Sequence, residues 1–158
     1  MEIVAEMDAR CASEELFEWV EDLSRYPRWL EIVTRAEPLA DDSAPGDPAG
    51  VEPSWAVDLR GRIGPLARSK RLRMIRTRHD VPRSVRFERA ELDGRTHSPW
   101  VLEADVGAIE GPEVGSRLTM RLSYGGGLFG PVLERVLRDE IERSRRRLAE
   151  LVEQETAS

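Results

Sequence analysis

The two histidines, His79 and His97, are the side chains best suited to proton transfer near neutral pH. Each is predicted to lie at the end of a strand, beside turn-forming residues. No serine, cysteine or aspartate stands in an arrangement that the sequence identifies as a catalytic triad. We therefore expect both imidazoles in solvent-exposed turns. His97 is the better candidate for a function, because it begins the strand that carries Trp100 and Leu102.

A pair of carboxylates, Glu103 and Asp105, could in principle serve as general acid and base. Both alternate with the apolar residues Trp100, Leu102 and Ala104. Because successive side chains of a strand point to opposite faces, both carboxylates should point away from the apolar face. No paired acid/base role is expected, and the sequence predicts no catalytic residue.

The single cysteine, Cys11, excludes an internal disulfide. Its neighbours lack metal-ligand spacing, so we expect a small, partly buried thiol in a protein of a reducing compartment. The N-terminal residues, with Glu2, Glu6 and Asp8, do not resemble a signal peptide. No stretch approaches the roughly 20 apolar residues that span a bilayer. The sequence thus predicts a soluble cytoplasmic protein without a metal or cofactor.

Two irregular segments could bind ions. The glycine-rich residues 125–130 lack the Gly-Lys-Ser/Thr of a phosphate loop, so a hinge is expected, although the start of the following helix could attract an anionic ligand group. Residues 40–50 are predicted to form a mobile loop. Its Asp41, Asp42 and Asp47 lack the spacing of a calcium loop, so solvated carboxylates are expected.

A basic run is the strongest charge feature. Its members are Arg68, Lys70, Arg71, Arg73, Arg76 and Arg78. The net charge of −6 argues against a general affinity for nucleic acid, and no aromatic stacking residues interleave the run. A solvated strand face is the preferred interpretation. An acidic partner remains open, as does a side chain that reaches inward to the carboxylate of a ligand.

The order of elements favours one α+β domain over residues 1–158. A chain of this length buries roughly two thirds of its unfolded surface. A strand over residues 2–9 precedes an amphipathic helix from Ser13, and a short second helix follows at Tyr26-Pro27. Six further strands are expected between about Ile32 and Tyr124.

Alternation assigns the inner face of most of these strands. The inward residues are expected to be Trp55, Val57 and Leu59; Val85 and Phe87; Trp100, Leu102, Ala104 and Val106; and Leu118, Met120, Leu122 and Tyr124. The strand over 66–78 is ambiguous, because Leu72 and Met74 lie on one parity and Ile75 on the other. Short turns such as Asp93-Gly94 predict antiparallel pairing.

A long C-terminal helix over about 129–154 closes the sequence. Its apolar positions recur along one face for more than five turns, with small Ser144 within the stripe. Beyond Ser144, the stripe is expected to serve packing alone, so that Leu148 should matter for stability.

The segment 16–29 resembles the first helix and the Tyr-Pro-x-Trp signature of the START-like, or SRPBCC, superfamily, with Tyr26, Pro27 and Trp29 at the matching positions. Residues 115–119 and 128–131 are similar to its last strand and to the entry to its gripping helix. The resemblance covers the whole chain. It implies a helix-grip fold, in which a curved seven-stranded antiparallel sheet wraps around the C-terminal helix.

The resemblance also implies a cavity for a hydrophobic small molecule between the sheet and the helix. We expect its walls to include Trp55, Met74, Phe87, Trp100, Leu102, Met120, Phe129, Leu133 and Leu137, which could equally fill a solid core. The ligand would be a lipid, a polyketide or an aromatic metabolite. Two alternatives remain: a polyketide cyclase or aromatase, and a toxin-like interaction module with an unknown protein partner.

Overall fold

The computed structural model describes residues 2–39, 52–63, 66–125 and 130–156, without the side chains of residues 61–68 and of most of residues 130–137. Its strands are β1 (Glu2–Ala9), β2 (Val33–Pro38), β3 (Ser54–Ile63), β4 (Leu66–Asp80), β5 (Ser84–Arg89), β6 (Trp100–Ala108) and β7 (Ser116–Tyr124). Its helices are α1 (Ser13–Val20), the 3-10 helix η1 (Leu23–Arg28) and α2 (Gly130–Thr156).

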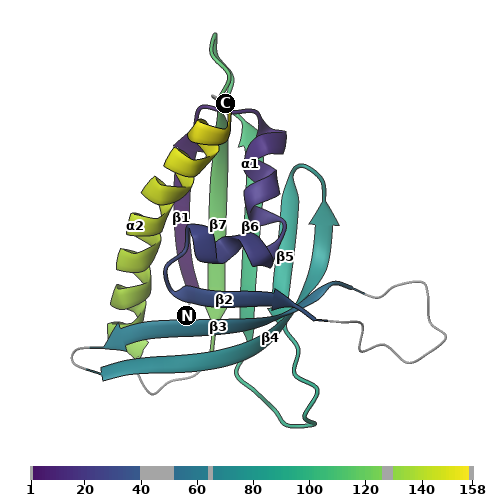
Figure 1. Ribbon diagram of the computed structural model, residues 1–158, viewed down its shortest axis with the longest axis vertical. Helices are drawn as coiled ribbons and strands as arrows, with labels where there is room; N and C mark the ends of the chain where they lie inside the picture. Colours follow the sequence, from purple (N-terminus) through teal and green to yellow (C-terminus); the bar gives the residue numbers. More distant parts are fainter. Residues whose placement is uncertain (1, 40–51, 64–65, 126–129, 157–158) are drawn as a thin grey trace, which may run out of the picture.

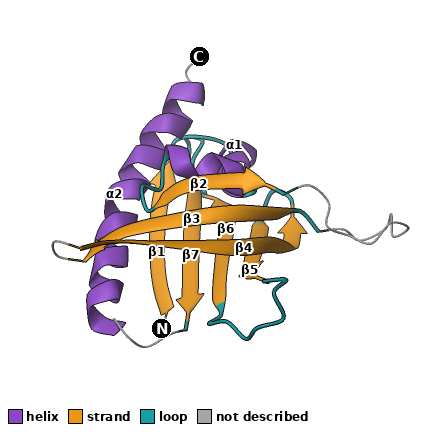
Figure 2. Ribbon diagram, turned by 60° about the horizontal axis from the view of Figure 1, so that its bottom comes forward, coloured by secondary structure: helices purple, strands orange, loops and turns teal. Residues whose placement is uncertain are grey.

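The seven strands form one antiparallel sheet in the order β1-β7-β6-β5-β4-β3-β2. The sheet is strongly curved: β2, β3 and β4 run across the other strands (Figure 1). Register shifts between Val33 and Arg35 in β2, and between Arg76 and Arg78 in β4, are irregularities of the kind that bend a strand. The helix α2 lies along β1 and also touches β3 (Figure 2). The expected helix-grip architecture is confirmed.

A polar and aromatic corner locks α1 and η1 onto the concave face. Four of the eight α1 residues are buried, which matches its predicted amphipathic pattern. The Tyr26 hydroxyl donates to the Val20 carbonyl at 2.9 Å, and the Trp29 indole donates to the Trp19 carbonyl at 3.4 Å. Asp22 accepts a hydrogen bond from the Ser24 amide at 2.9 Å and so caps η1. The Tyr-Pro-x-Trp residues therefore fix the corner.

The ambiguous strand has a clear orientation in the structure. In β4, Leu72 and Met74 are 2% and 5% exposed on the concave side, whereas Ile75 is half-buried on the other side. The predicted loop at 40–50 lies outside the described residues. Cys11 is buried with its Sγ 3.5 Å from the Ser116 hydroxyl, and burial raises the pKa of this thiol.

Candidate functional site

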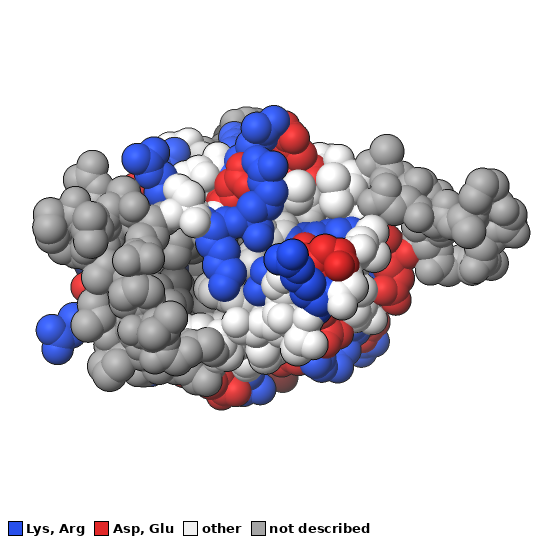
Figure 3. All heavy atoms as spheres, turned by 90° about the horizontal axis from the view of Figure 1, so that it is seen from below, with Lys and Arg blue, Asp and Glu red and all other residues white. Residues whose placement is uncertain are grey.

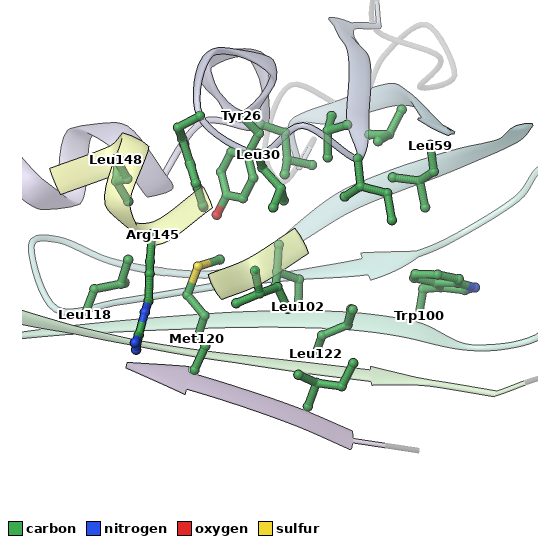
Figure 4. A pocket seen from close by; sticks show the side chains of 18 of the residues that line it. Tyr26, Leu30, Leu59, Trp100, Leu102, Leu118, Met120, Leu122, Arg145 and Leu148 are labelled. Atoms are coloured by element: carbon green, nitrogen blue, oxygen red, sulfur yellow. The ribbon is translucent and has the colours of Figure 1, made fainter. Parts of the chain in front are cut away.

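An apolar cavity of about 100 Å³ lies between the concave face of the sheet, η1 and α2. Every strand except β5 contributes described side chains to its wall. The volume is smaller than the roughly 150 Å³ of a dry protein cavity that binds benzene, so it suits a small apolar group. Figure 4 shows the wall side chains converging from these elements.

The alternation of the strands places these residues. On β7, every second residue points inward and lines the cavity: Leu118, Met120 and Leu122. On β1, Ile3, Ala5 and Met7 do the same, whereas Val4 on the outer face is 43% exposed. The cavity wall is thus the inner half of an ordinary amphipathic sheet.

Four of the nine sequence-predicted wall residues line the cavity: Met74, Trp100, Leu102 and Met120. Trp55 and Phe87 do not. Phe87 is fully buried between Tyr26 and Trp55, with ring centroids 6.2 Å and 5.5 Å away in edge-to-face geometry. The Trp55 indole donates to the Ser24 hydroxyl at 3.1 Å. Since η1 packs over this part of the concave face, both rings fill a solid core beside the cavity.

The α2 residues that line the cavity differ from the prediction, which placed wall residues at the start of the helix and packing residues beyond Ser144. Phe129 lies outside the described residues, and the side chains of Leu133 and Leu137 are not described. The α2 side chains that line the cavity are Ile141, Arg145 and Leu148. The prediction that the stripe beyond Ser144 serves packing alone is therefore wrong. Leu148 is fully buried and faces the cavity at the same time.

The wall residues that sequence reasoning missed come mainly from η1, from the turn after it and from β1. Tyr26, Trp29 and Leu30 enter the cavity from the corner between η1 and β2. Tyr26 and Trp29 match the family signature, but the sequence did not predict them as wall residues. The alternation of Ile3, Ala5 and Met7 along β1 was the signal for that strand.

Few polar side chains belong to the described part of the wall, and among them the Trp100 indole nitrogen is buried without a partner. The Tyr26 hydroxyl donates its hydrogen bond to the Val20 carbonyl. Burial, followed by the charge of Asp22, raises the pKa of this phenol. Arg145 donates to the Glu6 carbonyl at 2.7 Å and pairs with Glu142 at 2.7 Å, between α2 and β1. The one carboxylate residue of the described wall, Glu6, is exposed and has the outward parity of Val4, and the described wall contains no histidine.

The carboxylates Glu103 and Asp105 lie on the convex face, as predicted. Glu103 pairs with Arg86 at 3.2 Å and approaches Arg121 at 4.0 Å, whereas Asp105 is exposed. Neither residue belongs to the cavity wall.

The histidines also lie away from the wall, but each is held in place rather than free in a turn. His79 contacts Glu21 at 3.1 Å and stacks on Phe17, with 6.0 Å between ring centroids. His97 Nε2 lies 2.8 Å from Asp93, and its Nδ1 lies 3.3 Å from Arg89. Because a guanidinium only donates hydrogen bonds, Nδ1 must accept and Nε2–H must donate to Asp93.

The basic run divides between the two faces of β4. Arg71 faces outward and donates to Asp58 at 2.7 Å. Lys70 and Arg76 lie toward the concave side, where their cationic groups are 5.6 Å and 5.9 Å from the ring centroids of Trp100 and Trp55. The described part of the run therefore does not form one solvated face.

Comparisons with known proteins agree with this geometry. A family model described as polyketide cyclase / dehydrase and lipid transport matches residues 1–153. No curated protein matches the sequence significantly. The described helices include none long and apolar enough to cross a membrane.

Solved structures match across nearly the whole chain. A START superfamily protein from Mycobacterium smegmatis superposes with a TM-score of 0.66 at 15% identity, covering 97% of each chain. A protein from Thermus thermophilus gives 0.63 at 18% identity, covering 98% of this chain and 95% of that one. An aromatase/cyclase from Streptomyces sp. R1128 gives 0.62 at 13% identity, covering 99% and 95%. At these identities the matches show a shared fold.

Proposed function

Because the chain belongs to the polyketide cyclase / dehydrase and lipid transport family, we propose that it binds a hydrophobic small molecule, such as a lipid, polyketide or aromatic metabolite, in its cavity. One observation carries the proposal: the concave face holds a space of about 100 Å³ where a packed core would be expected. Well-packed interiors leave few voids larger than a water molecule. A void lined by apolar side chains favours an apolar occupant over water.

The composition of the wall supports a range of ligands rather than one rigid shape. Met7, Met74 and Met120 all line the cavity, from three different strands. Methionine is unbranched and polarizable, so it adapts to irregular shapes. Small differences in ligand size should therefore be absorbed by these three side chains.

Binding without chemistry is the simplest form of this function. The described wall lacks a group placed for acid/base catalysis, and its one phenol is engaged with a carbonyl. A cyclase or aromatase remains the second candidate, favoured by the fold shared with the Streptomyces aromatase/cyclase. Such an enzyme could work mainly by holding a reactive chain in a near-attack geometry. The toxin-like interaction module stays an untested hypothesis.

The proposal is tested by titration with 3-phenylpropan-1-ol, a neutral ligand with one ring, monitored by calorimetry. Native mass spectrometry of freshly purified protein would reveal a co-purified occupant. The variant Ala5→Phe places a ring in the cavity and should abolish binding. Val4→Phe adds a ring on the outer face of the same strand and should bind as the wild type does. If the alcohol does not bind, or if the two variants behave alike, the proposal is wrong.

A further inference from the structure

Lys70, the only lysine of the chain, stands at the rim of the cavity. The strand β4 pairs with β5 only between Met74 and Asp80, so its first half runs past the end of β5. Within that half, Lys70 has the same parity as Leu72 and Met74 and pairs with Leu59 of β3. Those three residues all line the cavity. Lys70 itself is exposed, which places it at the boundary between cavity and solvent.

The ammonium group reaches the ring of Trp100, which does line the cavity. Lys70 Nζ lies 5.6 Å from the ring centroid of Trp100, within cation–π range. Tyr124 stacks on the same ring at 5.2 Å. Figure 4 shows Trp100 at one end of the row of wall side chains, with its nitrogen at the outer edge. The apolar part of a bound molecule would thus lie in the cavity beside Trp100, and its polar group would lie near the Lys70 ammonium.

Trp100 also carries a buried donor without an acceptor. The residue is 9% exposed, and its Nε1 is buried with no hydrogen-bond partner among the described residues. The indoles of Trp55 and Trp29, by contrast, donate to Ser24 and to the Trp19 carbonyl. Since buried N–H groups are almost always paired, an acceptor supplied by a ligand would satisfy the free Nε1.

The charge at this rim is positive. Desolvation, followed by the charge of Arg89, lowers the pKa of Lys70. The neighbouring carboxylate of Glu91 is already engaged, by the Arg89 side chain at 2.9 Å and the Arg73 amide at 3.1 Å. No described carboxylate forms an ion pair with Lys70. Figure 3 shows basic side chains gathered near the middle of the face seen from below.

We propose that Lys70 and Trp100 bind the carboxylate of an amphiphilic acid whose apolar part occupies the cavity. This inference rests on the proposed function. One carboxylate oxygen accepts from the Lys70 ammonium, and the other accepts from Trp100 Nε1. A single negative charge matches a single ammonium beside an apolar ring.

The test compares 3-phenylpropanoate with 3-phenylpropan-1-ol, which share the same ring and chain length. Calorimetry should show the acid binding about tenfold more tightly than the alcohol, as expected for a charge-assisted hydrogen bond. Lys70→Met should remove that preference, so that the acid and the alcohol bind with equal affinity. Arg71→Met removes the same charge from the opposite face of the strand, and it should change neither affinity.

Nuclear magnetic resonance supplies a second readout. In ¹⁵N-labelled protein, the indole signal assigned by the Trp100→Phe variant should move downfield with the acid and much less with the alcohol. If the acid and the alcohol bind equally well, or if Lys70→Met and Arg71→Met have equal effects, the proposed carboxylate site is wrong. Binding of the ligands in the cavity would still be supported. If the acid binds but the Trp100 indole signal does not move, Trp100 is not part of the carboxylate site. If neither compound binds, both proposals are wrong.

Discussion

Trp55 and Trp100 occupy comparable positions on the concave face but belong to different regions. Both are nearly buried, at 4% and 9% exposed, and both lie near a cation from β4. Trp55 has a hydrogen-bond partner in Ser24 and packs edge-to-face on Phe87. Trp100 has a free indole nitrogen and faces the cavity. For these two indoles, burial alone does not separate core from binding wall, whereas the pairing of the indole nitrogen does.

The position of η1 explains why the surroundings of Trp55 and Trp100 differ. Where η1 covers the sheet, its polar atoms come close enough to satisfy buried donors, and its aromatic residue Tyr26 fills the space above Phe87. Farther along the sheet, no described element fills the space in front of Leu102 and Met120. The same inward alternation therefore produces a solid core at one end and a cavity at the other.

The largest effect that separates the two regions concerns stability. Phe87→Ala should lower the free energy of unfolding by about 3 to 5 kcal/mol, because it opens a new void in a solid core. Leu102→Ala should cost about 2 kcal/mol, at the low end for leucine, because its methyl groups already border empty space. Urea denaturation of both variants checks this. Equal losses would show that the region around Phe87 is no better packed than the cavity wall.

The two variants should also differ in ligand size preference. Leu102→Ala enlarges the cavity and should favour ligands bulkier than 3-phenylpropan-1-ol, whereas Phe87→Ala should leave the order of ligand preference unchanged. A matched calorimetric series of alcohols with larger rings measures this difference.

The sequence predicted the fold well because the sheet obeys a simple period. Along β6 and β7, the alternation from Trp100 to Val106 and from Leu118 to Tyr124 gave the inner face correctly. The Tyr-Pro-x-Trp signature gave the corner that holds η1. These features depend on neighbours in the sequence, so a single chain is sufficient to detect them.

The site was harder to predict, because it depends on distances between elements far apart in the sequence. Alternation places Trp55 and Trp100 on the same face but does not show which of them lies under η1. The parity of Lys70 with Leu72 was visible in the sequence. Its position beyond the end of β5 was not, because that depends on the register between β4 and β5.

A smaller effect compares the two indoles directly. Trp55→Phe and Trp100→Phe remove the same atoms, but only Trp55 loses a hydrogen bond and leaves the Ser24 hydroxyl without it. Trp55→Phe should therefore be the more destabilising by about 1 kcal/mol. Thermal or urea unfolding of the unliganded variants measures the difference. If Trp100→Phe costs as much or more, then Trp100 Nε1 makes a stabilising contact, and the comparison between the two regions fails.

The smallest effect concerns the pH dependence of acid binding, which only the Trp100 region should show. The ammonium form of Lys70 binds the carboxylate, so affinity for 3-phenylpropanoate should be full at neutral pH. It should fall as the pH rises through the pKa of Lys70, which desolvation and Arg89 hold below the ordinary value of 10.5. A bound carboxylate favours the charged form, so the complex should take up protons in this alkaline range.

Calorimetry in buffers of different ionisation enthalpy would detect that proton uptake. Lys70→Met should abolish it and should leave a flat pH profile for both acid and alcohol. Arg71→Met should keep the wild-type profile, because its charge lies on the outer face against Asp58. A pH dependence that survives in Lys70→Met would assign the titrating group to another residue. The carboxylate would then have to lie elsewhere on the rim, and the contrast between the two indoles would be one of packing alone.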